Sequence, residues 1–223
     1  YWTLWVELKF YLLVGLLIMV GISERRIVIF TLAWPLVGAL ARAADARLMT
    51  EVLSPDHAPY FAVGMLLYLI YRRGVSTMIF ISLALNVLLA ISLSKTAVVP
   101  FYRGATGVDL SPAVTAFLVV ASVGLVALVT LTRLSSVHSR GLIVAGALTY
   151  PLYLLHELFG WRLLQALHPV MPRYLALAVT VLVMLAFAYV VYRFVERPLS
   201  PLVRRSIERA VESVRRPRQV EEN

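Results

Sequence analysis

Two ionisable side chains lie in otherwise apolar stretches of the sequence, where they could carry out acid–base chemistry. Glu7 lies in YWTLWVELKFYLL, and His156 lies in GALTYPLYLLHELFG, residues 146–160. A charged group at membrane depth is costly unless it faces protein or a water-filled cavity. A carboxylate, and an imidazole with an ordinary pKa near ~6.5, can orient or deprotonate a hydroxyl group. We predict that Glu7 and His156 are catalytic and face one shared wet cavity.

Aromatic and acidic neighbours of His156 predict the wall of a pocket. On a helix, Tyr150, Tyr153 and Glu157 recur at i, i+3 and i+7 and share a face, with His156 at the edge of that face. Pro151 predicts a kink in the same helix. We therefore expect Tyr150, Tyr153 and Glu157 to bind substrate. The alternative for His156 is a hydrogen-bonded structural residue near a helix end.

Three further residues are candidates for substrate contacts. Tyr11 lies four positions after Glu7 and shares its helix face. His57, in SPDHAPYF, and Arg103, in FYRGATGVDLSP, lie in predicted loops. Arg103 could bind an anionic substrate group or simply pair with Asp109.

Structural alternatives apply to the first apolar stretch as well. Glu7 could form an ion pair with an arginine of a neighbouring helix, and Lys9 is expected to point away from Glu7 and extend toward water.

Histidines in separate segments without a third ligand are a weak metal signal, and the chain has no cysteine. We predict no metal site. Signatures for phosphate binding and serine hydrolysis, such as GxxxxGK[ST] and GxSxG, do not occur.

Composition indicates a membrane protein. Hydrophobic residues make up 61% of the 223 residues and charged residues only 15%, whereas a soluble domain carries about 25% charged residues. The net charge of +9 could suggest nucleic-acid binding. We exclude nucleic acid because the arginines lie in short loops and in the tail, which is typical of a protein of the inner (plasma) membrane.

Apolar stretches of helix length predict an all-α, polytopic bundle of about seven spans. Pro35, like Pro151, lies inside a span and should free a backbone carbonyl that needs a partner within the bundle. The predicted spans are Leu4 to Ile22, Ile27 to Ala43, Tyr60 to Tyr71, Thr77 to Leu93, Ala113 to Thr132, Leu142 to Gly160 and Tyr174 to Val195.

The arginines of the C-terminal tail determine the predicted orientation of the chain in the membrane. Arginines from Arg193 onward place the C-terminus in the cytoplasm, with residue 1 and His156 on the outer side. We predict a transmembrane domain over residues 1–197 and a basic cytoplasmic tail over residues 198–223. Pro198 should end the last span. Beyond it, Val203, Ile207, Ala210 and Val214 recur at helical spacing among arginines, which predicts an amphipathic helix on anionic lipid. A solvated tail is the alternative, and Gln219 to Asn223 should be disordered.

Three motifs taken together resemble the membrane acyltransferase family called acyltransferase 3. The family pattern W-S-L-x-x-E-x-x-F-Y is similar to residues 2–11, and S-Y-x-L-Y-L-x-H is similar to residues 149–156, with Thr3 and Thr149 in the serine positions. The closing Y-x-F-x-E-x-P resembles residues 192–198, and PYFAVGMLLYL resembles the family's central segment, F-x-x-G-M.

This resemblance implies transfer of an acyl group, often acetyl, from an acyl-CoA donor such as acetyl-CoA on the inner side to a carbohydrate hydroxyl on the outer side. Glycans of that family's members include lipopolysaccharide, peptidoglycan and exopolysaccharide. Family members also carry an arginine and a histidine in earlier helices, thought to be needed for acyl transfer, that have no counterpart here. We therefore expect this chain to lack the first helices, and a fragment without activity is one alternative.

The rival hypothesis is a proton-coupled transporter or a lipid-carrier flippase that uses Glu7 and His156 as a proton relay. Kinked helices and intramembrane ionisable groups fit both hypotheses. Inverted-repeat transporters usually show internal sequence symmetry, and neither motif is repeated between the halves of this chain. That difference favours the acyltransferase.

Overall fold

The computed structural model describes residues 2–137 and 139–215, and this part of the chain is helical with no strand. The described residues divide into two compact units, one within residues 1–137 and the other within residues 138–223. The predicted all-α fold is confirmed. The first unit contains α1 (Trp2–Val20), α2 (Glu24–Ala43), α3 (Arg47–Leu53), α4 (Ala58–Arg73), α5 (Thr77–Thr106), α6 (Pro112–Leu131) and a short 3-10 turn, Arg133–Ser136. The second contains α7 (Arg140–Leu155), a π-turn η2 (His156–Gly160), α8 (Trp161–Leu167), α9 (Arg173–Val191), a π-turn η3 (Tyr192–Glu196) and α10 (Arg197–Arg215).

Six helices in the described residues are long and apolar enough to cross a membrane, so the chain is a multi-pass membrane protein. They cover Thr3–Val20, Glu24–Ala43, Thr77–Thr106, Pro112–Leu131, Arg140–Leu167 and Arg173–Ser206. The third predicted span forms α4, which has 16 residues. At ~1.5 Å per residue α4 is about 24 Å long, shorter than the ~30 Å hydrocarbon core.

Helix α4 forms the centre of the first unit, where it packs against α2, α5 and α6. Its residues Ala58, Ala62 and Leu66 are fully buried, and Leu66 belongs to the apolar core cluster. Gly74 ends the helix at φ +86, a backbone conformation that glycine adopts without strain. Ser76 then caps α5 by accepting a hydrogen bond from the amide of Ile79.

The predicted consequence of Pro35 is confirmed in the contact between α2 and α5. Pro35 has no amide hydrogen to donate to the carbonyl of Thr31, four residues earlier. The Asn86 side chain donates to that carbonyl instead, at 2.9 Å, and also donates to the carbonyl of Ser82 at 2.9 Å. The Thr31 and Ser82 hydroxyl groups lie 3.3 Å apart. Asn86 therefore satisfies a carbonyl that the proline leaves without its helical partner.

Replacing Asn86 with Leu should lower the free energy of unfolding by about 1–2 kcal/mol, because the Thr31 carbonyl would be buried without a donor. The measurement is the thermal unfolding midpoint in detergent. Leu85→Ala is the control, because Leu85 is exposed on the same helix. Equal midpoints for the two variants would contradict this role of Asn86.

Helix α5 extends well beyond its predicted end at Leu93, so the predicted outer loop was wrong over residues 94–106. The helix continues through Lys95 and Pro100 and ends at Gly107, which is in the left-handed conformation. Lys95 and Arg103 are both exposed, so their charges need no buried partner. The extension places Ala97, Val98 and Phe101 on a helix rather than in a loop.

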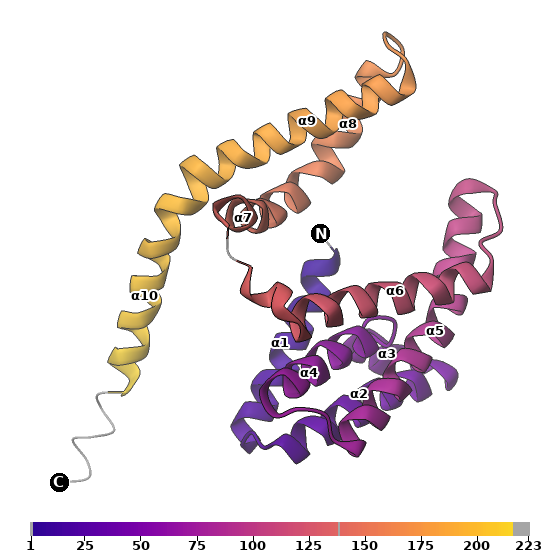
Figure 1. Ribbon diagram of the computed structural model, residues 1–223, viewed down its shortest axis with the longest axis vertical. Coiled ribbons are helices and arrows are strands. Elements are labelled where there is room, and N and C mark those ends of the chain that lie inside the picture. The colour runs from indigo at the N-terminus through magenta and orange to yellow at the C-terminus, as the bar shows by residue number, and fades with distance from the viewer. Residues whose placement is uncertain (1, 138, 216–223) are drawn as a thin grey trace. The chain divides into compact units, whose positions relative to one another are not determined.

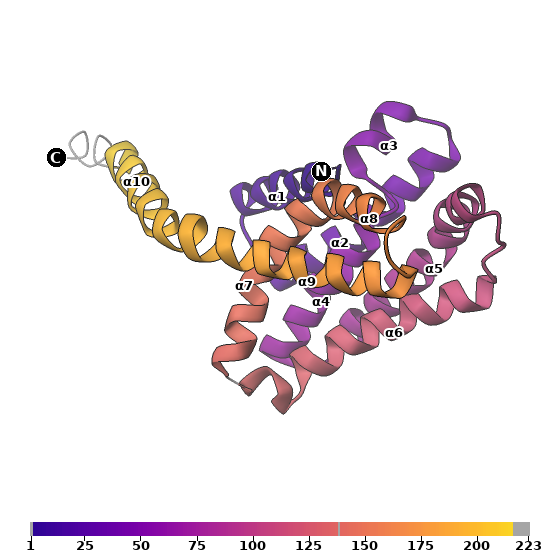
Figure 2. The same cartoon turned by 90° about the horizontal axis from the view of Figure 1, so that it is seen from above.

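The second unit is a hairpin in which α9 packs against α7 and α8 (Figures 1 and 2). Gly160 lies against Met184, and the rings of Phe159 and Phe187 meet edge to face. Each arm of the hairpin contains one π-turn, η2 or η3. Such turns account for well under 1% of residues and are frequent at functional sites.

The prediction that Pro198 ends the last span was wrong. The helix continues from α9 through η3 into α10, and its direction changes there (Figure 1). Pro198 is the second residue of α10 and follows directly on the π-turn η3. The predicted tail helix is confirmed as far as Arg215, while its contact with lipid stays a prediction. Gln219 to Asn223 lie outside the described residues.

Candidate functional site

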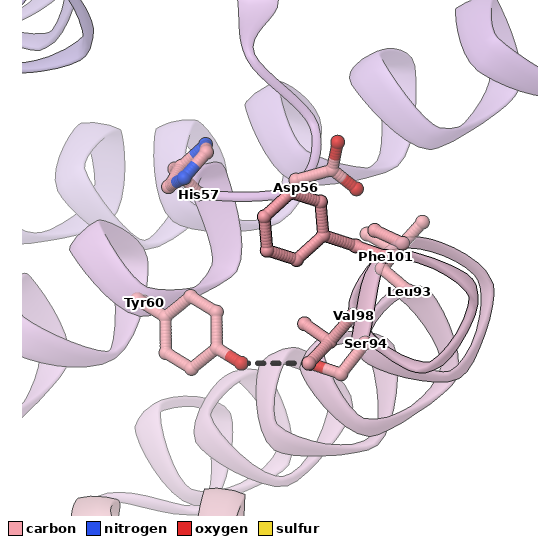
Figure 3. Close-up of a pocket in the computed structure, with 8 residues that line it drawn as sticks. Asp56, His57, Tyr60, Leu93, Ser94, Val98 and Phe101 are labelled. Atoms are coloured by element: carbon pink, nitrogen blue, oxygen red, sulfur yellow. Dashed lines mark hydrogen bonds between the residues drawn. The ribbon is translucent and has the colours of Figure 1, made fainter. Parts of the chain in front are cut away.

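An apolar cavity of about 400 Å³ lies between the loop before α4 and the extended end of α5. Its α5 wall is one helix face, because Leu93, Ala97, Val98 and Phe101 are spaced at i, i+4, i+5 and i+8. Figure 3 shows His57 and Tyr60 across the cavity from Leu93 and Val98. The Tyr60 and Ser94 hydroxyl groups are 2.9 Å apart and close one side. Asp56 completes the lining.

His57 lies where this cavity meets a second, polar recess of about 280 Å³. The imidazole is half-buried. Burial lowers the pKa of His57 below its ordinary value; Asp56 opposes that change and Lys9 adds to it. The ring is therefore neutral at neutral pH. A neutral imidazole can accept a proton, so His57 fits a general base.

The polar recess is formed by α1, α3 and the loop that follows α3. Lys9 donates to the backbone carbonyl of Glu51 at 2.5 Å and to its carboxylate at 3.2 Å. The hydrogen bond and charge of Lys9 hold the pKa of Glu51 below its ordinary value. The expectation that Lys9 extends toward water was wrong, because its side chain is only 13% exposed and forms an ion pair with Glu51. Trp5, Thr50 and Ser54 also line the recess.

An ion pair fixes the loop that carries His57. The Arg42 guanidinium, at the end of α2, donates to the carboxylate of Asp56. The Trp34 indole, also on α2, donates to the carbonyl of Leu53 at 2.9 Å. The first contact joins α2 to the loop between α3 and α4, and the second joins α2 to the last residue of α3, just before that loop. His57 is therefore held on a loop with two anchors rather than on a free one.

Glu7 and Tyr11 lie on α1 with exposed side chains. Neither lines the apolar cavity or the polar recess, although Lys9 and Trp5 of the same helix do line the recess. Aromatic rings attach α1 to the unit, since Phe10 stacks on Phe61 with centroids 4.3 Å apart. Glu7 belongs to the first unit and His156 to the second. A cavity shared by these two residues therefore stays a prediction.

His156 begins the π-turn η2, and its ring has a defined orientation. Its Nδ1 lies 3.0 Å from the carbonyl oxygen of Leu152 and 2.9 Å from that of Tyr153. Two acceptors at Nδ1 require the hydrogen of the neutral ring to be on that atom. Nε2 is then the nitrogen that can accept a proton. Backbone carbonyls thus orient His156, which is exposed.

The helix face predicted for Tyr150, Tyr153 and Glu157 is interrupted at the π-turn η2. Tyr150 and Tyr153 lie within α7, where the 3.6-residue period applies, and the Tyr153 ring lies 5.9 Å from the His156 ring. Glu157 lies inside the wider π-turn, where that period no longer sets its direction. Tyr150 and Glu157 are exposed. Substrate binding by these three residues stays a prediction.

Arg103 forms the ion pair with Asp109 that the sequence analysis gave as its alternative role. Its Nε lies 3.2 Å from a carboxylate oxygen of Asp109, and both side chains are exposed. Arg103 lies near the end of α5 but is not part of the cavity lining. Its contact with substrate stays a prediction.

Sequence reasoning missed several residues of this site. Lys9, Glu51 and Ser94 were not proposed as site residues, and the α5 wall was missed because the helix was expected to end at Leu93. The spacing of Leu93, Ala97, Val98 and Phe101 was the available signal.

Within residues 2–137 and 139–215 no group of three or more acidic or histidine side chains could hold a metal ion. In comparisons with family models, with curated proteins and with solved structures, none matches this chain.

Proposed function

We propose that this protein is an integral membrane acyltransferase that moves an acyl group from an acyl-CoA-type thioester to a hydroxyl group of a carbohydrate. One observation carries the proposal: a half-buried imidazole, that of His57, lies between an apolar cavity and a polar recess. Acyl transfer to a hydroxyl needs a base next to both an apolar acyl group and a polar acceptor. The resemblance of three motifs to the acyltransferase 3 family supports the same reaction.

The reaction balances with His57 as the base. The acceptor hydroxyl gives its proton to the imidazole while its oxygen forms a C–O bond at the thioester carbonyl. The C–S bond then breaks, and the leaving thiolate takes the proton back from the imidazolium. His57 is neutral before and after each turnover, which its lowered pKa favours at neutral pH.

The polar recess is suited to hold the carbohydrate. Lys9 and Glu51 offer a charged pair, and Thr50 and Ser54 add hydroxyl groups. Hydroxyl-rich ligands are recognised by such donors and acceptors. In this proposal His57 and Asp56, which line both spaces, meet the acceptor hydroxyl at the border between the recess and the cavity.

The candidates outside these two spaces keep their predicted roles as part of the proposal. Glu7 and His156 orient or polarise reactants, and Tyr11, Arg103, Tyr150, Tyr153 and Glu157 contact substrate. The two π-turns support a role for the second unit, because η2 begins at His156, the last residue of the second motif, and η3 lies within the third motif. Glu7→Gln should abolish transfer without removing the protein from the membrane.

We also propose that the protein lies in the inner (plasma) membrane with its C-terminus in the cytoplasm. In α10, exposed Leu202 and Val203 are followed by exposed Arg204, Arg205 and Arg209, and such a combination of apolar and basic side chains suits an anionic lipid surface. The chain has no cysteine, so a single cysteine at position 209 can be labelled selectively. An impermeant maleimide should leave it unlabelled in intact cells and label it in opened membranes.

The function is tested with membranes that contain the protein, incubated with acyl-CoA labelled in its acyl group. Label should appear in the glycan fraction in a form released by mild alkali, as expected for an ester. Membranes from cells without the gene are the control. Equal labelling in both would overturn the proposal, and proton-driven uptake of solute by vesicles in its place would support the transporter.

A further inference from the structure

The apolar cavity is large for the acetyl group that the family resemblance implies. An acetyl group has three heavy atoms, and at roughly 30 Å³ for each, the share of one molecule in liquid water, it fills about 90 Å³. The cavity measures about 400 Å³. More than half of it would stay empty around an acetyl group, whereas well-fitted ligands are largely enclosed.

The lining favours a hydrocarbon chain over a polar ligand. Leu93, Ala97, Val98 and Phe101 present only carbon atoms along the α5 wall. The Tyr60 and Ser94 hydroxyl groups already pair with each other, and the Asp56 carboxylate already pairs with Arg42. Among the lining residues no lysine or arginine is present to bind a phosphate or a carboxylate.

The cavity also has a direction. Leu93 and Ser94 are buried at its inner end, while Phe101 is 78% exposed at its rim. His57 and Asp56 lie where the cavity meets the polar recess. A hydrocarbon lying along the α5 wall would therefore have its carbonyl end near the imidazole.

We propose that this cavity binds the acyl chain of the donor, and that the donor carries a chain of about eight carbons rather than acetyl, which is about what ~400 Å³ accommodates with clearance. This inference rests on the proposed acyltransferase function and adds the class of acyl group. Each methylene buried against the α5 wall should tighten binding about fourfold. Acyl-CoA affinity should thus rise with chain length up to the length of the cavity.

The test uses the full protein in phosphatidylcholine nanodiscs and measures binding of octanoyl-CoA that carries a photoreactive group at the end of its acyl chain. Photolabelling should modify residues 93–101, as located by mass spectrometry. Unlabelled octanoyl-CoA should compete roughly 10³-fold better than acetyl-CoA, because six more methylenes are buried at about fourfold each.

Ala97→Phe should weaken octanoyl-CoA binding by about tenfold or more, because the new ring fills the cavity. Ala121→Phe is the matched control, since Ala121 is exposed on α6 and outside the cavity, and it should change binding less than about twofold. Ala97→Leu repeats the test with a smaller side chain if the phenylalanine variant does not fold.

Equal competition by acetyl-CoA and octanoyl-CoA would overturn the inference. So would labelling of residues 93–101 that octanoyl-CoA cannot displace but that a photoreactive phosphatidylcholine reproduces, because the occupant would then be a membrane lipid. These results are separate from the fate of the function itself: acyl transfer to glycan without preference for chain length keeps the acyltransferase and removes only this inference.

Discussion

His57→Gln should reduce acyl transfer to the glycan by at least about 100-fold, because loss of a positioned general base usually costs roughly 10²–10⁴-fold in rate. Glutamine is polar and similar in length, so the Asp56 loop, anchored by Arg42, should keep its position. The measurement is the initial rate of label transfer from acyl-CoA in membranes, normalised to protein content.

His168→Gln is the matched control for this variant. His168 is exposed in the turn after α8 and lies in neither the cavity nor the recess. Its rate should stay within about twofold of wild type. A His57→Gln variant as active as His168→Gln would remove His57 from the mechanism.

The same histidine predicts how the rate depends on pH. Burial keeps the pKa of His57 below its ordinary value of ~6.5. The unprotonated base should therefore persist into mildly acidic solution, and the rate should fall only as the pH drops through that lowered pKa. A rate that is already falling between about pH 8 and 7 would contradict this assignment.

Replacing His156 should also abolish transfer, and the pattern across substitutions should identify which nitrogen acts. Nδ1 is held by the carbonyl oxygens of Leu152 and Tyr153, so Nε2 is the atom available to a substrate. A glutamine amide can reach the position of Nε2, and an asparagine amide the position of Nδ1. If Nε2 contacts the substrate, His156→Ala and His156→Asn should lose about 100-fold or more in rate, while His156→Gln keeps a measurable part.

The opposite order would assign His156 a structural role in η2. In that case His156→Asn would retain activity and stability, and His156→Gln would lose both. Thermal unfolding of each variant, measured with the rates, separates the two outcomes. His168→Gln serves as the control here too.

Hydrophobic runs predicted most of the helices, because a helix that crosses a membrane must be apolar over most of its length. The same reasoning explains why Pro35 needed a partner for the Thr31 carbonyl, which the structure supplies from Asn86. Helix α3 was not predicted because it has only seven residues and its sequence, RLMTEVL, has no apolar run of helix length.

The end of α5 and the two π-turns were missed for different reasons. Lys95, Pro100 and Arg103 suggested a loop, yet a helix tolerates exposed charges, and Pro100 removes one hydrogen bond from α5 without ending it. A π-turn is a change in hydrogen-bond pattern and leaves composition unchanged. Neither the cavity nor the recess was predictable, because both depend on how the Asp56 loop packs against α1 and α5.

The proposed function is tested by the mass of the surface glycan from cells with the wild-type gene, without it, and with His57→Gln. The proposal predicts that the wild-type glycan carries an alkali-labile mass equal to one or more acyl groups. That mass should be missing both without the gene and with His57→Gln, while the variant protein remains in the membrane at the wild-type level. A glycan of the same mass in all three strains would contradict the account.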